Sequence, residues 1–110
     1  MYIYNVTTNV HESIHSQWLN WMKTTHIPAM LGTEKFTKAK MSQVMVNEEM
    51  GGITYSVQYT TDSIETLNDY YKTDATKLRE ESTRLFGDKI VAFRTELKVI
   101  TEQFSMSTKN

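Results

Sequence analysis

Apolar and polar residues alternate with a period of two in several segments of the chain, and this alternation predicts β-strands. The clearest case is ITYSVQYT, in which every second residue from Ile53 to Tyr59 is apolar. The expected strands cover residues 2–7, 35–47, 53–60 and 89–100. The turn EEMGG joins the second strand to the third, so these two should form a hairpin. The second strand has apolar residues on both faces, which predicts that both of its sides are covered.

Apolar residues spaced three and four apart predict two amphipathic helices between the strands. The first should begin at a capping box formed by Asn9 and Glu12. It should end by about His26, because Pro28 disfavours helical geometry for the residue that precedes it. The second should open at the capping box DSIE and end at Gly87, a residue suited to a C-terminal cap. The sequence leaves open whether KTDAT breaks this second helix.

The order strand, helix, strand, strand, helix, strand closes most simply as a ferredoxin-like α+β sandwich with right-handed crossovers. We expect a four-stranded antiparallel sheet with both helices on one face, in a single domain over 1–102 followed by a polar tail over 103–110. A second copy of the chain is the simplest cover for the open face, which would give a homodimeric α/β barrel. The residues expected on this open face, a mixed polar and apolar set, are Ser56, Gln58, Ile90, Ala92, Arg94 and Glu96.

The charge balance argues against nucleic acid and membrane surfaces as partners. The 110 residues include twelve Lys and Arg and thirteen Asp and Glu, so the net charge is close to zero. No basic field therefore exists to hold phosphate backbones or anionic lipid. The start MYIYNVTTN lacks the basic and apolar runs of a signal peptide, so the cytoplasm is the expected location. The absence of cysteine excludes disulfides and thiolate chemistry, and no cofactor is expected.

HESIH (11–15) matches the zinc-protease pattern H-E-x-x-H, in which two histidines share one face of a helix. Such a centre needs a third ligand, and the remaining histidine, His26, would lie ~22 Å from His11 along a straight helix at ~1.5 Å per residue. We therefore expect no metal site. GGITYSVQY superficially resembles the aromatic strand of the RNA-recognition fold, but no Lys or Arg precedes its glycines, so RNA binding is not expected either.

The segment WLNWMKTTHIPAML carries the strongest candidate for a functional site. Trp18 and Trp21 fall on the apolar face of the first helix, where they form either ordinary core or the wall of a pocket. His26 is expected at the end of that helix, where the helix dipole favours its protonated form. It could then hold an anionic oxygen or act as an acid or base, or it could simply cap the helix.

Aromatic residues on the strands would complete this pocket. Tyr4, Tyr55 and Tyr59 fall on the strand face that should meet the tryptophans. Together with Phe93 they would line a cavity suited to a flat apolar or aromatic ligand. Arg94 and Glu96 are two residues apart on one strand, and we interpret them as a structural ion pair.

Four stretches of the chain resemble one known family over nearly its whole length: WxxWMxxxHIP, FxxAKM, GGITYSVQY and VAFRTELKVI. That family comprises short bacterial proteins known only as a domain of unknown function, and it is similar to a branch of the dimeric α/β-barrel proteins. Better-studied relatives of this architecture include cofactor-free monooxygenases of polyketide quinones, lactone isomerases, haem-degrading enzymes and dye peroxidases, besides members with no known activity. The resemblance implies the fold more than a reaction.

Two functions therefore stay open at this point. One is a small-molecule pocket with cofactor-independent oxygenase or isomerase chemistry, in which His26 polarises an oxygen. The other is a non-catalytic homodimeric module for interaction or regulation, in which the aromatic residues are core.

Overall fold

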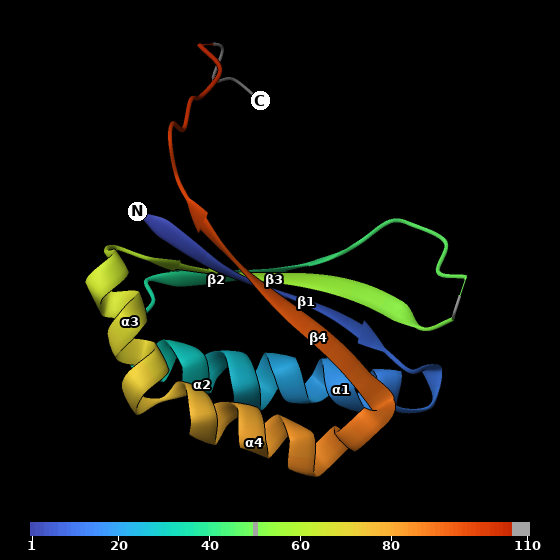
Figure 1. Ribbon diagram of the computed structural model, residues 1–110. Helices are drawn as coiled ribbons and strands as arrows, with labels where there is room; N and C mark the ends of the chain where they lie inside the picture. Colours follow the sequence, from blue (N-terminus) through green and yellow to red (C-terminus); the bar gives the residue numbers. More distant parts are fainter. Residues whose placement is uncertain (50, 107–110) are drawn as a thin grey trace.

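A computed structural model of the chain describes residues 1–49 and 51–106, and these contain a four-stranded antiparallel sheet (Figure 1). Its strands are β1 (Tyr2–Val10), β2 (Lys38–Gln43), β3 (Ile53–Thr61) and β4 (Ile90–Lys98). They lie in the order β2-β3-β1-β4, and the helices cover one face of the sheet. This is the predicted ferredoxin-like arrangement.

Strand register decides which side chains meet the helices. Tyr4 lies opposite Tyr59 on β3 and opposite Glu96 on β4, so these three side chains share the helix-facing side of the sheet. The strand residues at the centre of the core are 1% exposed or less: Tyr4, Val10, Val57 and Tyr59. The opposite face, which carries Ile3 and Thr7, has no helix over it (Figure 1).

The prediction for the open face is right for β3 and wrong for β4. Ser56 lies opposite Thr7, and Thr7 lies opposite Phe93, so even-numbered residues of β3 share a face with odd-numbered residues of β4. Arg94 and Glu96 consequently face the helices. Odd or even numbering alone does not give the face of a residue, because even-numbered residues of one strand can share a face with odd-numbered residues of another.

The first helical stretch is longer than predicted. α1 (His15–Trp21) continues through a π-helical segment, η2 (Met22–His26), into α2 (Ile27–Gly32). The N–H of Ile27 donates to the carbonyl of Met22, five residues back. This wider turn accommodates the following proline, whose ring and missing N–H would disrupt a regular α-helix. His26 therefore lies inside the helical stretch and not at its C-terminus, contrary to the prediction.

The same stretch begins later than predicted, because β1 extends to Val10. Asn9 belongs to the strand, and its side-chain amide donates to Thr54 Oγ1 at 3.1 Å instead of capping a helix. A short 3₁₀ turn, η1 (Glu12–Ile14), comes before α1. Its N-cap is His11, whose Nδ1 accepts the backbone N–H of Ser13 at 3.0 Å.

The second helical stretch is divided at KTDAT, the point that the sequence left open. α3 (Ile64–Thr73) ends and α4 (Ala75–Phe86) begins around Asp74. Lys35 Nζ lies 2.9 Å from a carboxylate oxygen of Asp74 and 3.5 Å from one of Asp69. These ion pairs tie the break to the loop that follows α2.

The ends of this divided stretch lie close to their predicted places. Ser63 is the N-cap of α3, and its Oγ accepts the N–H of Thr66 at 3.1 Å, whereas the sequence pointed to the preceding residue, Asp62. Gly87 closes α4 with φ of 56°, as predicted, and begins the short turn η3 (Gly87–Lys89).

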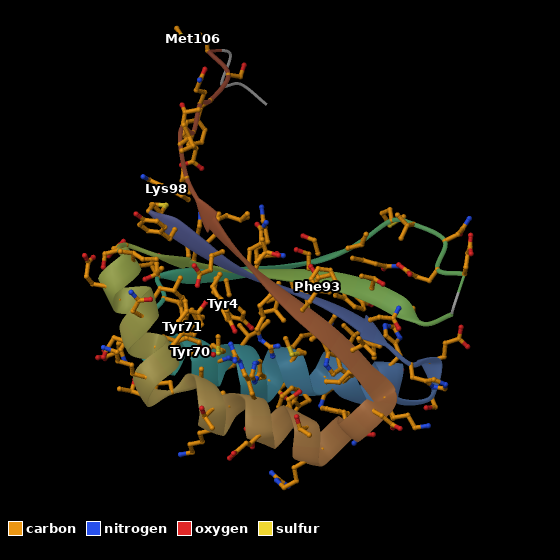
Figure 2. All side chains as sticks on the ribbon, viewed as in Figure 1. Tyr4, Tyr70, Tyr71, Phe93, Lys98 and Met106 are labelled. Atoms are coloured by element: carbon orange, nitrogen blue, oxygen red, sulfur yellow. The ribbon has the colours of Figure 1, made fainter. Side chains whose placement is uncertain are left out.

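Two parts of the molecule lie at its periphery. β2 is an edge strand, and Lys38 and Lys40 on its open face are exposed, so within one chain only one of its two sides is covered. Beyond Lys98 the chain leaves the sheet and runs to Met106, far from the helices (Figure 2). We call residues 99–106 the C-terminal arm. No helix in the described ranges is long and apolar enough to cross a membrane.

Candidate functional site

A cavity of about 50 Å³ lies between the sheet and the helices. Apolar side chains from both layers form much of its wall, among them Val6, Met22 and Val57. At roughly 10–15 Å³ per molecule, this volume has room for about four waters. The polar residues that line it come from strands and helices alike: Tyr4, Thr8, His26, Tyr59, Tyr70, Arg79, Ser82 and Arg94.

The hydroxyl of Tyr4 is the centre of the polar side of this cavity. Arg79 Nη2 donates to it at 2.9 Å and Arg94 Nε donates to it at 3.1 Å. The ring of Tyr4 is buried and packs against Tyr70 and Tyr71 with centroid separations of 5.4 and 5.7 Å (Figure 2). Strand β4 and helix α4 thus each supply one guanidinium to the same phenol oxygen on β1.

Neither guanidinium has a carboxylate partner among the described residues. The ion pairs there involve Lys35 and Arg84, but not Arg79 or Arg94. Arg79 lies 5.9 Å from the centroid of the Tyr71 ring, and its Nε is buried without a hydrogen-bond partner. The predicted ion pair between Arg94 and Glu96 is therefore wrong.

Glu96 binds a tyrosine instead of an arginine. The hydroxyl of Tyr71 donates to its carboxylate at 2.6 Å. Burial, followed by this hydrogen bond, raises the pKa of Tyr71. Arg94 and Glu96 are both exposed although they face the helices, and Arg94 lines the cavity, so the cavity meets solvent on the β4 side.

His26 enters the cavity from the π-helical segment. Its ring stacks on Trp21 with a centroid separation of 4.7 Å, and its Nδ1 is buried without a hydrogen-bond partner. Burial lowers the pKa of His26 to about 4; Glu81 opposes this shift and Arg94 adds to it. The histidine is therefore neutral at pH 7. The expectation of a protonated His26 fails because the residue is neither at a helix C-terminus nor in water.

Most of the residues predicted for a pocket surround this one cavity. Trp18 is buried against Tyr55, whereas Trp21 packs edge-on against Phe86 at 5.2 Å. The predicted residues that line the cavity are Tyr4, Trp18, Trp21, His26 and Tyr59.

Two predicted residues lie elsewhere. Tyr55 is bound to His15, whose Nε2 lies 2.6 Å from its hydroxyl, and the two rings stack at 5.7 Å. Phe93 is 62% exposed and lies on the open face of the sheet, opposite Thr7. The prediction that Phe93 lines the cavity is wrong, because Phe93 lies on the same side of the sheet as Thr7 of β1, and that side is the open face.

The sequence analysis missed Arg79 and misread Arg94, the two cations of the site. Arg79 and Ser82 interrupt the inward-facing side of α4, where Ala75 and Phe86 are buried. A charged residue among the apolar residues of one helix face could have indicated that Arg79 belongs to a site. Its partner Tyr4 is 75 residues away along the chain, so no local pattern joins the two.

The H-E-x-x-H motif forms no metal centre in the described part of the chain, where no group of three metal-ligating side chains comes together. His11 serves as an N-cap and His15 binds Tyr55, as described above. Both histidines are thus used in local structure.

The fold and the cavity together define a ferredoxin-like α+β protein with a pocket between its sheet and helices. Within that class, the chain belongs to the family described as Domain of unknown function (DUF4286), whose sequence profile matches residues 1–100. This confirms the resemblance seen in the sequence. No curated protein matches the chain.

Solved structures share this fold at low sequence identity. Two are dimeric ferredoxin-like proteins from uncultured marine organisms. One is 15% identical with a TM-score of 0.67, over 96% of this chain and 100% of its own. The other is 12% identical with a TM-score of 0.67, over 93% and 97%. An ethyl tert-butyl ether D (EthD) family protein from Bacillus halodurans is 14% identical with a TM-score of 0.64, over 86% and 97%.

Proposed function

We propose that the protein is a homodimer whose helix-sheet cavity binds a small molecule, with neutral His26 as the acid-base group of the site. The observation that carries the proposal is a pair of buried polar atoms at the cavity, His26 Nδ1 and Arg79 Nε, that have no hydrogen-bond partner. An unpaired buried polar group costs about 1–3 kcal/mol. A ligand or ordered water that pairs both atoms would recover that free energy.

The volume of the cavity limits what it can enclose. Sites for drug-sized ligands have roughly 300–1,000 Å³, whereas this cavity has about 50 Å³. A flat aromatic ligand of the kind expected from the sequence could insert only one edge or substituent. The remainder would extend past Arg94 toward the exposed edge of β4.

A neutral histidine near two cations can take part in proton transfer, but its lowered pKa makes it a weaker base than free imidazole, so the guanidinium groups must stabilise the product anion. Imidazole that is unprotonated at pH 7 accepts a proton from a bound substrate, and nearby guanidinium groups stabilise the negative charge that develops on a substrate oxygen. This chemistry fits an isomerase or a cofactor-independent oxygenase that acts through an enolate-like anion. His26 would be the base, while Arg79 and Arg94 would stabilise the oxyanion.

The open face of the sheet supports the homodimer. Val91, Phe93 and Leu97 expose apolar side chains there. A groove of about 710 Å³ lies where this face meets the C-terminal arm, with Ile3, Gln58 and Leu97 in its wall. Apolar surface of this kind favours contact with another protein. A second copy of the chain, facing the first across the sheet, would cover it.

A non-catalytic interaction module is the second candidate, and the arm is the observation that favours it. Ile100 and Phe104 are each 82% exposed and Met106 is 96% exposed. A partner protein that buried these side chains would explain why they are apolar, and it would require no ligand in the cavity.

Native mass spectrometry of untagged protein, isolated quickly from cells, tests both candidates at once. We expect a dimer that carries an additional small mass, retained in His11→Ala and lost in His26→Ala. A bare dimer in the wild type would favour the interaction module. A monomer would contradict the homodimer itself.

A further inference from the structure

We infer that the ligand of the cavity carries a carboxylate, which binds between Arg79 and Arg94 above the hydroxyl of Tyr4. The inference rests on the proposed function, since it assigns the chemical class of the molecule that the cavity holds. It adds a specific anion site that the sequence did not predict.

The charges around the cavity are unbalanced. Among the described residues no Asp or Glu lines it, while Arg79 and Arg94 both do. Their hydrogen-bond acceptor in the described structure is one phenol oxygen, that of Tyr4. Arg79 is partly buried, and a cation in such a place is stabilised by an ion of opposite charge in direct contact. An anionic ligand supplies that ion.

The donors converge on one place. Arg79 reaches Tyr4 through Nη2 and Arg94 reaches the same oxygen through Nε, at 2.9 and 3.1 Å. A guanidinium has five N–H donors, so each arginine keeps others for a ligand. One of them, Arg79 Nε–H, is already buried and unpaired. Two oxygens of a carboxylate can accept from such donors at the same time.

The rest of the wall favours an organic acid over inorganic phosphate. The cavity has room for about four waters, enough for the carboxylate and first carbon atoms of a short acid, and apolar side chains such as Val6, Val57 and Ile90 surround the polar side. A short carbon chain would bury itself against them, whereas phosphate would present oxygen atoms to them. We therefore choose butyrate as the probe.

Tryptophan fluorescence reports on this cavity directly, because both tryptophans of the chain line it. Butyrate, butyramide and inorganic phosphate are titrated at constant ionic strength, with the protein in its native oligomeric state. We expect a saturable change with butyrate and binding at least about tenfold weaker with the uncharged butyramide, a difference of about 1.4 kcal/mol. Equal binding of the two would overturn the carboxylate assignment, and so would stronger binding of phosphate.

Matched variants locate the anion. Arg79→Met and Arg94→Met keep an unbranched apolar side chain and remove the charge, and each should weaken butyrate binding at least about tenfold. Arg84→Met is the control, because Arg84 lies on the same helix as Arg79 but its side chain is 68% exposed and pairs with Glu81. Unchanged affinity in Arg94→Met overturns the inference even if Arg79→Met does not fold.

The outcomes separate this inference from the proposed function. If butyramide binds as well as butyrate, and native protein carries a bound molecule, the cavity is a binding site but not an anion site. If neither compound changes the fluorescence and the native protein is bare, the proposed function fails together with the carboxylate.

Discussion

The residues that define the site owe their properties to burial more than to their chemical type. His26 is an ordinary imidazole that desolvation keeps neutral, and Tyr4 is a core phenol whose hydroxyl happens to meet two guanidinium groups. Arg79 contacts Tyr4 and Tyr71 and has no carboxylate partner in the part of the chain that the structure describes. Each of these side chains makes a separate contribution to stability that substitution can measure.

The pH dependence of stability should reveal His26. Its pKa falls from 6.5 to about 4 on folding. Between these values the unfolded chain binds a proton that the folded chain does not, so stability decreases as the pH is lowered through this window. The loss attributable to His26 amounts to about 3 kcal/mol at most.

Urea unfolding at a series of pH values provides the measurement. His26→Phe keeps an aromatic ring against Trp21 and removes the titration, so its stability should depend less on pH between about 6.5 and 4. His11→Phe, which removes a histidine outside the cavity, should retain the dependence that His26 causes. The assignment of a buried neutral His26 is wrong if both variants titrate alike.

Removal of the Tyr4 hydroxyl should destabilise the fold. Tyr4→Phe leaves Arg79 and Arg94 without their shared acceptor, and we expect a loss of about 1–3 kcal/mol in the free energy of unfolding. Tyr2→Phe, at the same strand's start, should change it by less than about 0.5 kcal/mol. Chemical denaturation of both variants measures the difference, and equal losses would show that the hydroxyl of Tyr4 makes no special contribution.

At the level of helices and strands, the sequence predicted what depends on local periodicity and missed what depends on register or on distant partners. The strands, the hairpin and the cap at Gly87 follow from alternation and turn chemistry. The first helical stretch continues beyond His26 because a π-helical turn accommodates the proline. The expectation that a helix ends before a proline does not include such a turn.

The same distinction holds within the site. Tyr4, Tyr59 and Trp18 were placed on the correct faces by period alone. Phe93 was misplaced because alternation along one strand does not give its register with the next. Arg79 was missed because its acceptor is on the other side of the fold.

Two neighbouring glycines allow a sharp test of the β2-β3 hairpin. Gly51 and Gly52 have φ of 85° and 80°, but a Cβ at Gly52 would lie 2.9 Å from the Val10 carbonyl oxygen, whereas one at Gly51 meets nothing within 4 Å. Gly51→Ala should cost about 1–2 kcal/mol for its backbone conformation alone. Gly52→Ala should cost about 1–3 kcal/mol more, because backbone must move. Thermal unfolding of the pair checks this, and equal costs would contradict the close approach of β1.

At the level of the whole molecule, the helices cover one face of the sheet and leave the other without a helix over it. Apolar side chains remain exposed on that face and along the C-terminal arm. A homodimer through this face would make the predicted α/β barrel and leave the cavity of each chain between its own sheet and helices.

A charge on the open face should separate the two copies. Phe93→Asp places a carboxylate where the second chain is expected, so sedimentation velocity should show a monomer in place of the wild-type dimer. Val46→Asp is the control, because Val46 is 59% exposed in the loop between β2 and β3. A Phe93→Asp protein that remains dimeric would place the interface elsewhere.

The central claim is that the cavity binds a carboxylate ligand, and a crystal structure of the protein soaked in butyrate tests it most directly. We expect electron density for the carboxylate within hydrogen-bond distance of Arg79 and Arg94, with His26 Nδ1 paired to the ligand or to a water beside it. A cavity that holds only water molecules after soaking, or that has closed, would contradict the claim.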